Sequence, residues 1–131
     1  MAAQKFRFIV VFLLSSCAMA SNVDNINLEN IEIDNQLSEC ASFGNTAIST
    51  DGAVPIFSFD LEVHKPIAEC GCKSALGSYA VYTSSEGYKS YIIGGKVGFL
   101  ASEKKYLPLS AEQNLIKKRK LIVKFSCAQT D

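Results

Sequence analysis

Four cysteines constrain the fold of this chain more than any other feature of its sequence. They are Cys40, Cys70, Cys72 and Cys127. An even number of thiols in a short exported chain is typical of a disulfide framework. In an extended strand, Cys70 and Cys72 cannot bridge each other without strain. Two pairings therefore stay open: 40–70 with 72–127, or 40–72 with 70–127.

The first twenty residues predict export. Lys5 and Arg7 precede the apolar run 8–14, and the small residues Ala18 and Ala20 form a cleavage site for signal peptidase. The apolar run is too short to span a bilayer as a helix. We therefore expect a signal peptide over residues 1–20. A single β-sandwich domain over residues 21–131 would then be periplasmic or secreted.

The same leader contains a second candidate cleavage site. Residues 14–17 (LSSC) resemble the lipobox of bacterial lipoproteins, in which the cysteine is acylated and becomes the first residue. Residues 1–16 would then be a lipoprotein signal, and Cys17 would anchor the protein in a membrane. Because Ala18 follows in place of the aspartate that retains lipoproteins in the inner membrane, the resemblance implies the outer membrane. Without lipidation we expect no membrane contact.

The Cys70/Cys72 pair also permits another chemistry. Together with His64, these thiols could form a soft copper site or a redox-active dithiol. A redox pair usually opens a helix, whose dipole lowers the thiol pKa, whereas residues 73–82 are expected to form a strand. We therefore favour structural disulfides and expect no cofactor. A copper- or redox-handling protein is the alternative.

Alternating apolar and polar residues predict an all-β fold. The clearest half-buried strand is 57–63, where phenylalanine, leucine and valine alternate with polar residues. The other expected strands are 26–33, 79–82, 91–93, 97–100, 106–107 and 121–127. About seven short strands favour an antiparallel, immunoglobulin-like β-sandwich stapled by disulfides.

Turn and loop signals separate these strands. Residues 84–87 (SSEG) predict a turn, and Gly94-Gly95 is expected to mark a hairpin or bulge between two strands. Residues 36–53 are expected to form a long polar loop. Ser110, with Gln113 three residues later, predicts one short helix before the last strand.

Charge is unevenly distributed along the predicted mature chain. Residues 21–62 carry −8 and residues 63–131 carry +6, and we expect opposite charges to meet where N-terminal and C-terminal strands pair. The densest basic block consists of Lys117, Lys118, Arg119 and Lys120, with Lys124 nearby. No aromatic residue interleaves with this block, so nucleic acid is not an expected partner. An anionic envelope surface or another protein is expected instead.

Catalytic signatures are scarce in this sequence. Its single histidine is His64, and it contains no G-x-S-x-G, H-E-x-x-H or P-loop motif. We therefore expect a non-catalytic protein. The five tyrosines can build a contact face or form the tips of strands; they are Tyr79, Tyr82, Tyr88, Tyr91 and Tyr106.

As a whole, the chain resembles small exported bacterial proteins of unknown function. The resemblance rests on the signal peptide, the C-x-C pair ahead of a tyrosine-rich strand, and the C-terminal Phe125-Ser126-Cys127. It implies an envelope location and no particular activity. The expected role is contact with another macromolecule, as an inhibitor, an immunity-like protein or an envelope accessory. An outer-membrane lipoprotein with a structural role is a further alternative.

Overall fold

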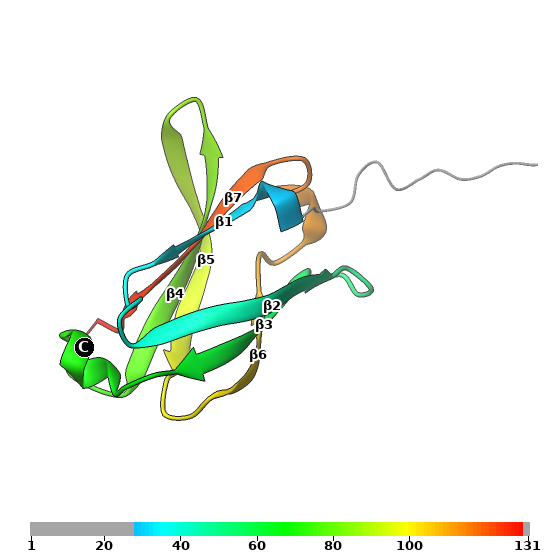
Figure 1. Cartoon of the computed structure of the whole chain (residues 1–131). Helices are drawn as coiled ribbons and strands as arrows, with labels where there is room; N and C mark the ends of the chain where they lie inside the picture. The colour runs from blue at the N-terminus through cyan, green and yellow to red at the C-terminus, as the bar shows by residue number, and fades with distance from the viewer. Residues whose placement is uncertain (1–27, 130–131) are drawn as a thin grey trace, which may run out of the picture.

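Two β-sheets face each other in the computed structural model, which describes residues 28–129 (Figure 1). One sheet has the strand order β1-β7-β4-β5, and the other has the order β2-β3-β6. The strands are β1 (Ile31–Asn35), β2 (Ala41–Ser49), β3 (Ile56–Val63), β4 (Leu76–Ser85), β5 (Tyr88–Gly98), β6 (Glu103–Pro108) and β7 (Lys120–Cys127). The 3-10 helices are η2 (Leu28–Asn30), η3 (Ile67–Cys70) and η4 (Gln113–Leu115). The all-β, two-sheet fold predicted from the sequence is confirmed.

The sheet topology differs from the predicted one in two respects, the direction of one strand and the order of the strands. β1 runs parallel to β7, so the expectation of a wholly antiparallel sandwich is wrong at this edge. The chain crosses to the other sheet directly after β1, which leaves β1 as an edge strand beside β7. An immunoglobulin domain places its strands in the orders 1-2-5-4 and 3-6-7. The order found here is another one, so an immunoglobulin-like arrangement is not confirmed.

Phenylalanine rings from both sheets fill the space between them. Phe57 and Phe59 of β3 and Phe125 of β7 are fully buried. The ring of Phe43, on β2, stacks on Phe125 with centroids 4.1 Å apart, and Phe59 meets Phe125 edge-on at 5.5 Å. Burying such large rings is the main source of stability in a fold of this kind. The alternation predicted for strand 57–63 is thereby confirmed.

The β4–β5 hairpin projects beyond the rest of the molecule (Figure 1). Its turn consists of Glu86 and Gly87, with positive φ angles of 50° and 86°. Two consecutive positive φ angles are the signature of a type I′ turn, whose twist matches that of the two strands. The turn predicted at residues 84–87 is therefore confirmed.

β5 is a single strand of 11 residues. The expected separation into two strands at Gly94-Gly95 is wrong, because both glycines pair with β4 in regular register. The irregularity lies earlier, where Ile92 is an extra residue between the pairs made by Tyr91 and Ile93. Neither the hairpin nor the bulge expected at Gly94-Gly95 forms there, and the bulge lies at Ile92 instead.

β2 is the strand that the sequence pattern does not reveal. The sequence predicts a loop over residues 36–53, whereas β2 occupies nine of these residues. Its pairing with β3 shifts between Gly44 and Ala47. A bulge interrupts the two-residue period of side chains, and an edge strand needs few large apolar residues. The polar composition of this segment therefore conceals a strand.

The short helix expected after Ser110 forms only one 3-10 turn, η4. The N-cap residue of η4 is Glu112, and the hydroxyl of Ser110 donates to the carbonyl oxygen of Glu112, so Ser110 is not the N-cap. The strand expected over residues 26–33 is also shorter, since η2 precedes β1. The remaining 3-10 helix, η3, lies between β3 and β4.

The predicted signal peptide, residues 1–20, and the lipidation candidate Cys17 lie outside the described residues. Both cleavage sites, and the single domain over residues 21–131, therefore stay predictions. Within residues 28–129 we find no helix with the length and hydrophobicity required to span a bilayer.

Candidate functional site

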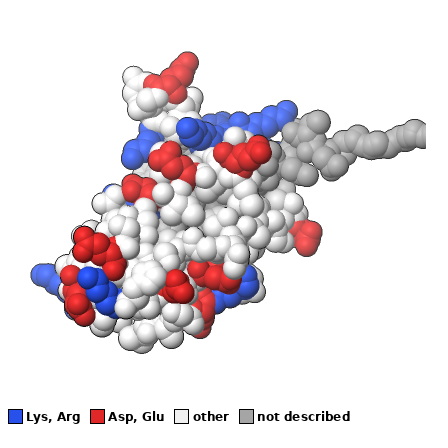
Figure 2. Space-filling model, in the orientation of Figure 1, with Lys and Arg blue, Asp and Glu red and all other residues white. Residues whose placement is uncertain are grey.

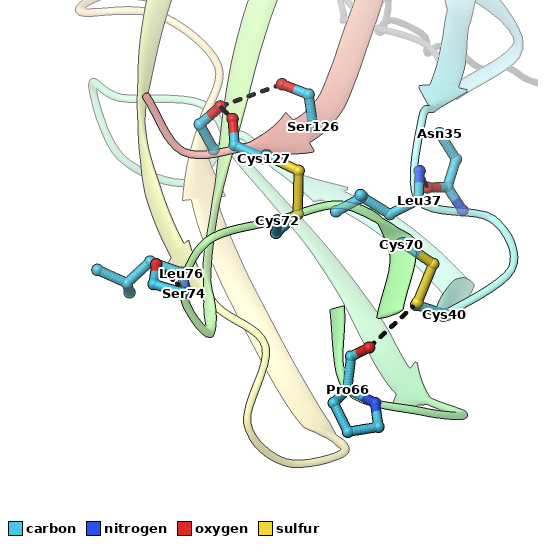
Figure 3. Close-up of a disulfide and its surroundings, with 11 residues drawn as sticks. Asn35, Leu37, Cys40, Pro66, Cys70, Cys72, Ser74, Leu76, Ser126 and Cys127 are labelled. Carbon is cyan, nitrogen blue, oxygen red and sulfur yellow. Dashed lines mark hydrogen bonds between the residues drawn. A yellow bond between two sulfur atoms is a disulfide. The ribbon is translucent and has the colours of Figure 1, made fainter. Parts of the chain in front are cut away.

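The four cysteines form two disulfides at one end of the sandwich. Cys40 pairs with Cys70, and Cys72 pairs with Cys127. The first bridge joins the turn before β2 to the end of η3, and the second joins the loop before β4 to the end of β7 (Figure 3). The disulfides expected from the sequence are confirmed, in the first of the two pairings left open.

Cys70 and Cys72 reach different partners because the chain turns sharply between them. Gly71 has a φ angle of 97°, in the left-handed region that favours glycine, and its N–H donates to the carbonyl oxygen of Ala68. The two cysteines do not lie in an extended strand. Cys70 ends η3, and β4 begins at Leu76.

With both disulfides closed, neither Cys70 nor Cys72 has a free thiolate. His64, the other candidate ligand, follows β3 at the surface. Its Nε2 lies 3.1 Å from Ser42 Oγ and 3.9 Å from Glu62 Oε1. Among residues 28–129, no three His, Cys, Asp or Glu side chains converge as metal ligands. Cys70 and Cys72 each belong to a separate disulfide.

A mainly apolar hollow of about 420 Å³ lies next to the Cys40–Cys70 bridge. Its walls come from the chain around η3, the loop before β4 and the connection between β5 and β6. Pro66, whose carbonyl oxygen lies 3.3 Å from Cys40 Sγ, forms one side of the hollow, and the exposed Leu100 also lines it. His64 and Lys65 are the ionisable residues that line it. The side chains that line this hollow do not together favour one chemical class of ligand.

The five tyrosines do not form one common contact face. Tyr79 is a core residue, and burial, with a smaller effect of Tyr91, raises its pKa. Tyr88 lies at the tip of the hairpin, and Tyr106 lies on the outward side of the three-stranded sheet. Tyr82 and Tyr91 are the two that meet, edge to face, with ring centroids 5.9 Å apart.

Tyr82 and Tyr91 lie on the outward side of the four-stranded sheet. The neighbours of Tyr82 along β4, Val81 and Thr83, are buried on the opposite side, and the strand register places Tyr91 of β5 beside Tyr82. The strand register places Ile122 of β7 opposite Tyr82, and Tyr82 opposite Tyr91 of β5. These three side chains therefore form one apolar row across three strands.

Lysines lie on both sides of this row. Toward the hairpin tip, Lys120 and Lys89 are both opposite Ser84 of β4. On the other side, Lys124 is opposite Ala80. We call this outward surface the Tyr–Lys face. It consists of Tyr82, Lys89, Tyr91, Lys120, Ile122 and Lys124.

Of the two aromatic rings of the Tyr–Lys face, Tyr82 is half-buried and Tyr91 is exposed. The ammonium group of Lys89 lies 5.4 Å from the centroid of the Tyr82 ring, a distance at which a cation interacts with the ring. Tyr91 is 62% exposed. A Cβ atom at Gly94 would lie 2.8 Å from the Tyr91 hydroxyl oxygen. Because glycine has no Cβ, position 94 leaves room for the Tyr91 side chain to lie along the sheet.

The basic block predicted from the sequence lies at one end of this face. Lys117, Lys118 and Arg119 form the turn after η4, Lys120 begins β7, and Lys124 is in the middle of β7. Within the described part of the chain, Lys120 and Lys124 make no ion pair. Figure 2 shows Lys and Arg gathered at the foot of the projecting hairpin, with acidic side chains beside them.

Opposite charges meet across paired strands, as the sequence predicts. In the four-stranded sheet, Asp34 of β1 lies opposite Lys124 of β7. In the three-stranded sheet, Asp60 of β3 forms an ion pair of 3.2 Å with Lys104 of β6. The N-terminal acidic strands therefore offset part of the C-terminal basic charge.

The sequence does not reveal the Tyr–Lys face, because lysines and tyrosines are far apart along the chain. No aromatic residue interleaves with residues 117–124, yet pairing of β4 with β7 places Tyr82 between Lys120 and Lys124. The alternation within each strand predicts which side chains share a side. It does not tell which strands are neighbours, and that pairing creates the site.

Comparison with known proteins gives a match to a family model. A family model described as "Uncharacterized protein conserved in bacteria (DUF2195)" matches residues 11–130. This match confirms the resemblance to bacterial proteins of unknown function. No curated protein and no solved structure matches the chain.

Proposed function

We propose that this chain, which belongs to the DUF2195 family of uncharacterised proteins conserved in bacteria, is an exported, non-catalytic domain that binds another macromolecule of the cell envelope. The contact surface is the Tyr–Lys face, and no cofactor is required. The observation that carries the proposal is a pair of tyrosine rings in contact, Tyr82 half-buried and Tyr91 exposed, bordered by lysines on a β-sheet.

The composition of the Tyr–Lys face suits binding. Tyrosine provides a large contact area at a low cost in conformational entropy, because it has few rotatable bonds. Lys120 and Lys124, which make no ion pair within the described residues, create a positive potential that attracts an anionic partner. Asp34 and Glu32, on the neighbouring strand β1, limit this attraction to one side of the face.

The sheet under the face is suited to hold the binding residues in fixed positions. On its inner side, Val81, Val123 and Phe125 are fully buried against the other sheet. The Cys72–Cys127 disulfide ties the end of β7 to the loop before β4. Binding residues on strands are positioned more accurately than residues on loops, so a partner meets a preorganised surface.

The two disulfides support export, because such bridges persist in oxidising compartments such as the periplasm. An intact mass of the protein purified from its bacterial host without reductant tests this part of the proposal. We expect a soluble chain that begins at Ser21 and has no alkylatable thiol. A chain that begins at an acylated Cys17 would make it a membrane-anchored lipoprotein, and free thiols at Cys70 and Cys72 would favour copper or redox chemistry.

Site-specific photo-crosslinking in the bacterial host tests the binding role. A benzophenone amino acid replaces Tyr91 in one variant and Tyr106 in the matched control. Both tyrosines are similarly exposed, at 62% and 65%, but they lie on opposite sheets. We expect a discrete adduct from position 91 and none from position 106. No adduct at position 91, or the same adduct at both, would contradict the proposal.

A further inference from the structure

The arrangement of side chains on the Tyr–Lys face indicates the chemistry of its ligand. The apolar row of Ile122, Tyr82 and Tyr91 crosses β7, β4 and β5, and it leads to the open edge of the sheet at β5. Lysines flank this row on both sides. Neighbouring strands are about 4.8 Å apart, and outward residues along a strand recur about every 6.6 Å. An elongated ligand lying along the row would therefore have positive charges on both sides.

We infer that the Tyr–Lys face binds a linear anionic polysaccharide, and this inference rests on the proposed binding function. Each sugar ring offers an apolar face of C–H groups, which the negative face of a tyrosine ring attracts, and hydroxyl groups that the tyrosine hydroxyl can bond. Carboxylate or phosphate groups at the sides of the sugar chain would reach Lys89, Lys120 and Lys124. One linear polymer thus meets both kinds of group on the face.

The choice of lysine also favours a repeating polymer. An arginine fork recognises one carboxylate in a fixed, bidentate geometry, whereas the lysine ammonium is a compact point charge on a flexible stem. All three cations of the Tyr–Lys face are lysines. They can follow a chain of regularly spaced charges without requiring a single register, which suits a polysaccharide better than one acidic residue of a folded protein.

An anionic membrane fits this surface less well. The hairpin that carries Tyr91 projects beyond the sheet and ends in Glu86, which an anionic bilayer would repel. Glu32 and Asp34 border the face along β1. A flat bilayer would contact all of these carboxylates at once, whereas a single sugar chain can follow the tyrosine row and leave β1 uncovered.

The direct test measures binding of a fluorescent oligogalacturonate to the disulfide-bonded protein at low salt. Three comparison probes separate the contributions: the methyl-esterified oligomer keeps the sugar rings without charge, polyglutamate keeps the charge without sugar rings, and phosphatidylglycerol vesicles present a lipid surface. We expect the oligogalacturonate to bind most tightly. We also expect its binding to weaken as salt is added, because exposed charges are screened.

Matched variants show whether binding uses the Tyr–Lys face. Y91A and K124Q should each weaken oligogalacturonate binding by about tenfold, as contacts near the centre of an interface do. Y106A removes a similarly exposed tyrosine, and K104Q removes the same charge, from the other sheet; both should bind like the wild type. Urea unfolding of all four variants verifies that each is folded.

Several results would overturn the inference. These are equal binding of the methyl-esterified oligomer or polyglutamate, binding to vesicles alone, or equal effects of Y91A and Y106A. If no oligosaccharide binds while position 91 still forms its specific crosslink in the host, the polysaccharide inference fails and the proposed binding role stands. If the crosslink is also missing, both fail.

Discussion

The outward sides of the two sheets both carry lysine and tyrosine, but their charges are arranged differently. On the three-stranded sheet, Asp60 accepts a hydrogen bond of 2.7 Å from Asn45 and forms an ion pair of 3.2 Å with Lys104. On the four-stranded sheet, Lys120 and Lys124 have no ion-pair partner within residues 28–129. Charge is satisfied internally on one sheet and remains available to a partner on the other.

This difference follows from which strands are neighbours. β3 carries acidic residues and lies beside β6, which carries basic ones. β7 lies between β1 and β4, and the outward residues of β4 are uncharged, namely Ser78, Ala80, Tyr82 and Ser84. On its β4 side, β7 lies beside a neutral, tyrosine-bearing strand, and on its β1 side Asp34 lies opposite Lys124. On the other sheet, the basic strand β6 lies beside the acidic strand β3, and Lys104 and Asp60 of these strands form an ion pair.

The largest effect is expected from the disulfides, one of which is attached to each sheet. Replacing Cys72 and Cys127 by serine should lower the free energy of unfolding by about 4.2 kcal/mol, and replacing Cys40 and Cys70 by about 3.6 kcal/mol. These values follow from the chain entropy of loops of 55 and 30 residues. Urea unfolding without reductant measures both. If removing the 40–70 bridge lowers the free energy of unfolding more than removing the 72–127 bridge does, the four-stranded sheet is not the more strongly tethered of the two.

Alanine substitution of one glycine in each sheet compares how tightly the two sheets are packed. A Cβ at Gly77 of β4 would lie 2.5 Å from the Phe99 ring and 3.0 Å from the Ser126 carbonyl oxygen, so Gly77→Ala should cost about 1–3 kcal/mol. A Cβ at Gly44 of β2 meets no atom within 4 Å, and Gly44→Ala should change stability by less than about 0.5 kcal/mol. Thermal and urea unfolding check both values. Equal losses would contradict this difference in packing.

The hairpin that presents Tyr91 depends on its turn. Because Gly87 has a φ angle of 86°, Gly87→Ala should destabilise the protein by roughly 1 kcal/mol. Gly52→Ala is the control, since its Cβ would meet no atom within 4 Å and its φ angle is not in the left-handed region. Urea unfolding compares the two variants. If Gly87→Ala is as stable as Gly52→Ala, the hairpin does not need its positive φ angle.

The smallest effect concerns the paired charges of the three-stranded sheet. The hydrogen bond from Asn45, and then the interactions with Lys104, hold the pKa of Asp60 below its ordinary value of 3.8. The stabilisation from this carboxylate is present above pH 3.8 and is lost as the pH falls through the lowered pKa. NMR titration should show that Asn45→Ala and Lys104→Gln both raise the pKa of Asp60. An unchanged pKa in both variants would show that the contacts with Asn45 and Lys104 do not lower the pKa of Asp60 in solution.

Local patterns predict those elements whose signal lies within a few residues. The alternation over residues 57–63 predicts β3, and the residues Ser84–Ser85–Glu86–Gly87 predict the hairpin turn. β2 escapes detection because its bulge interrupts the alternation. The break predicted at Gly94-Gly95 does not occur because β4 supplies a paired neighbour along the whole of β5. Pairing with an adjacent strand thus overrides the local preference of glycine.

By itself, the sequence determines the β-sheet class, the number of cysteines available for bridging and the side of each strand on which tyrosine or lysine lies. These properties depend on side-chain period and composition, which are local. Only the tertiary structure decides that Cys40 joins Cys70 and that Tyr82 lies between Lys120 and Lys124. Both facts depend on which distant segments become neighbours, and that choice is made by packing of the whole core rather than by any single segment.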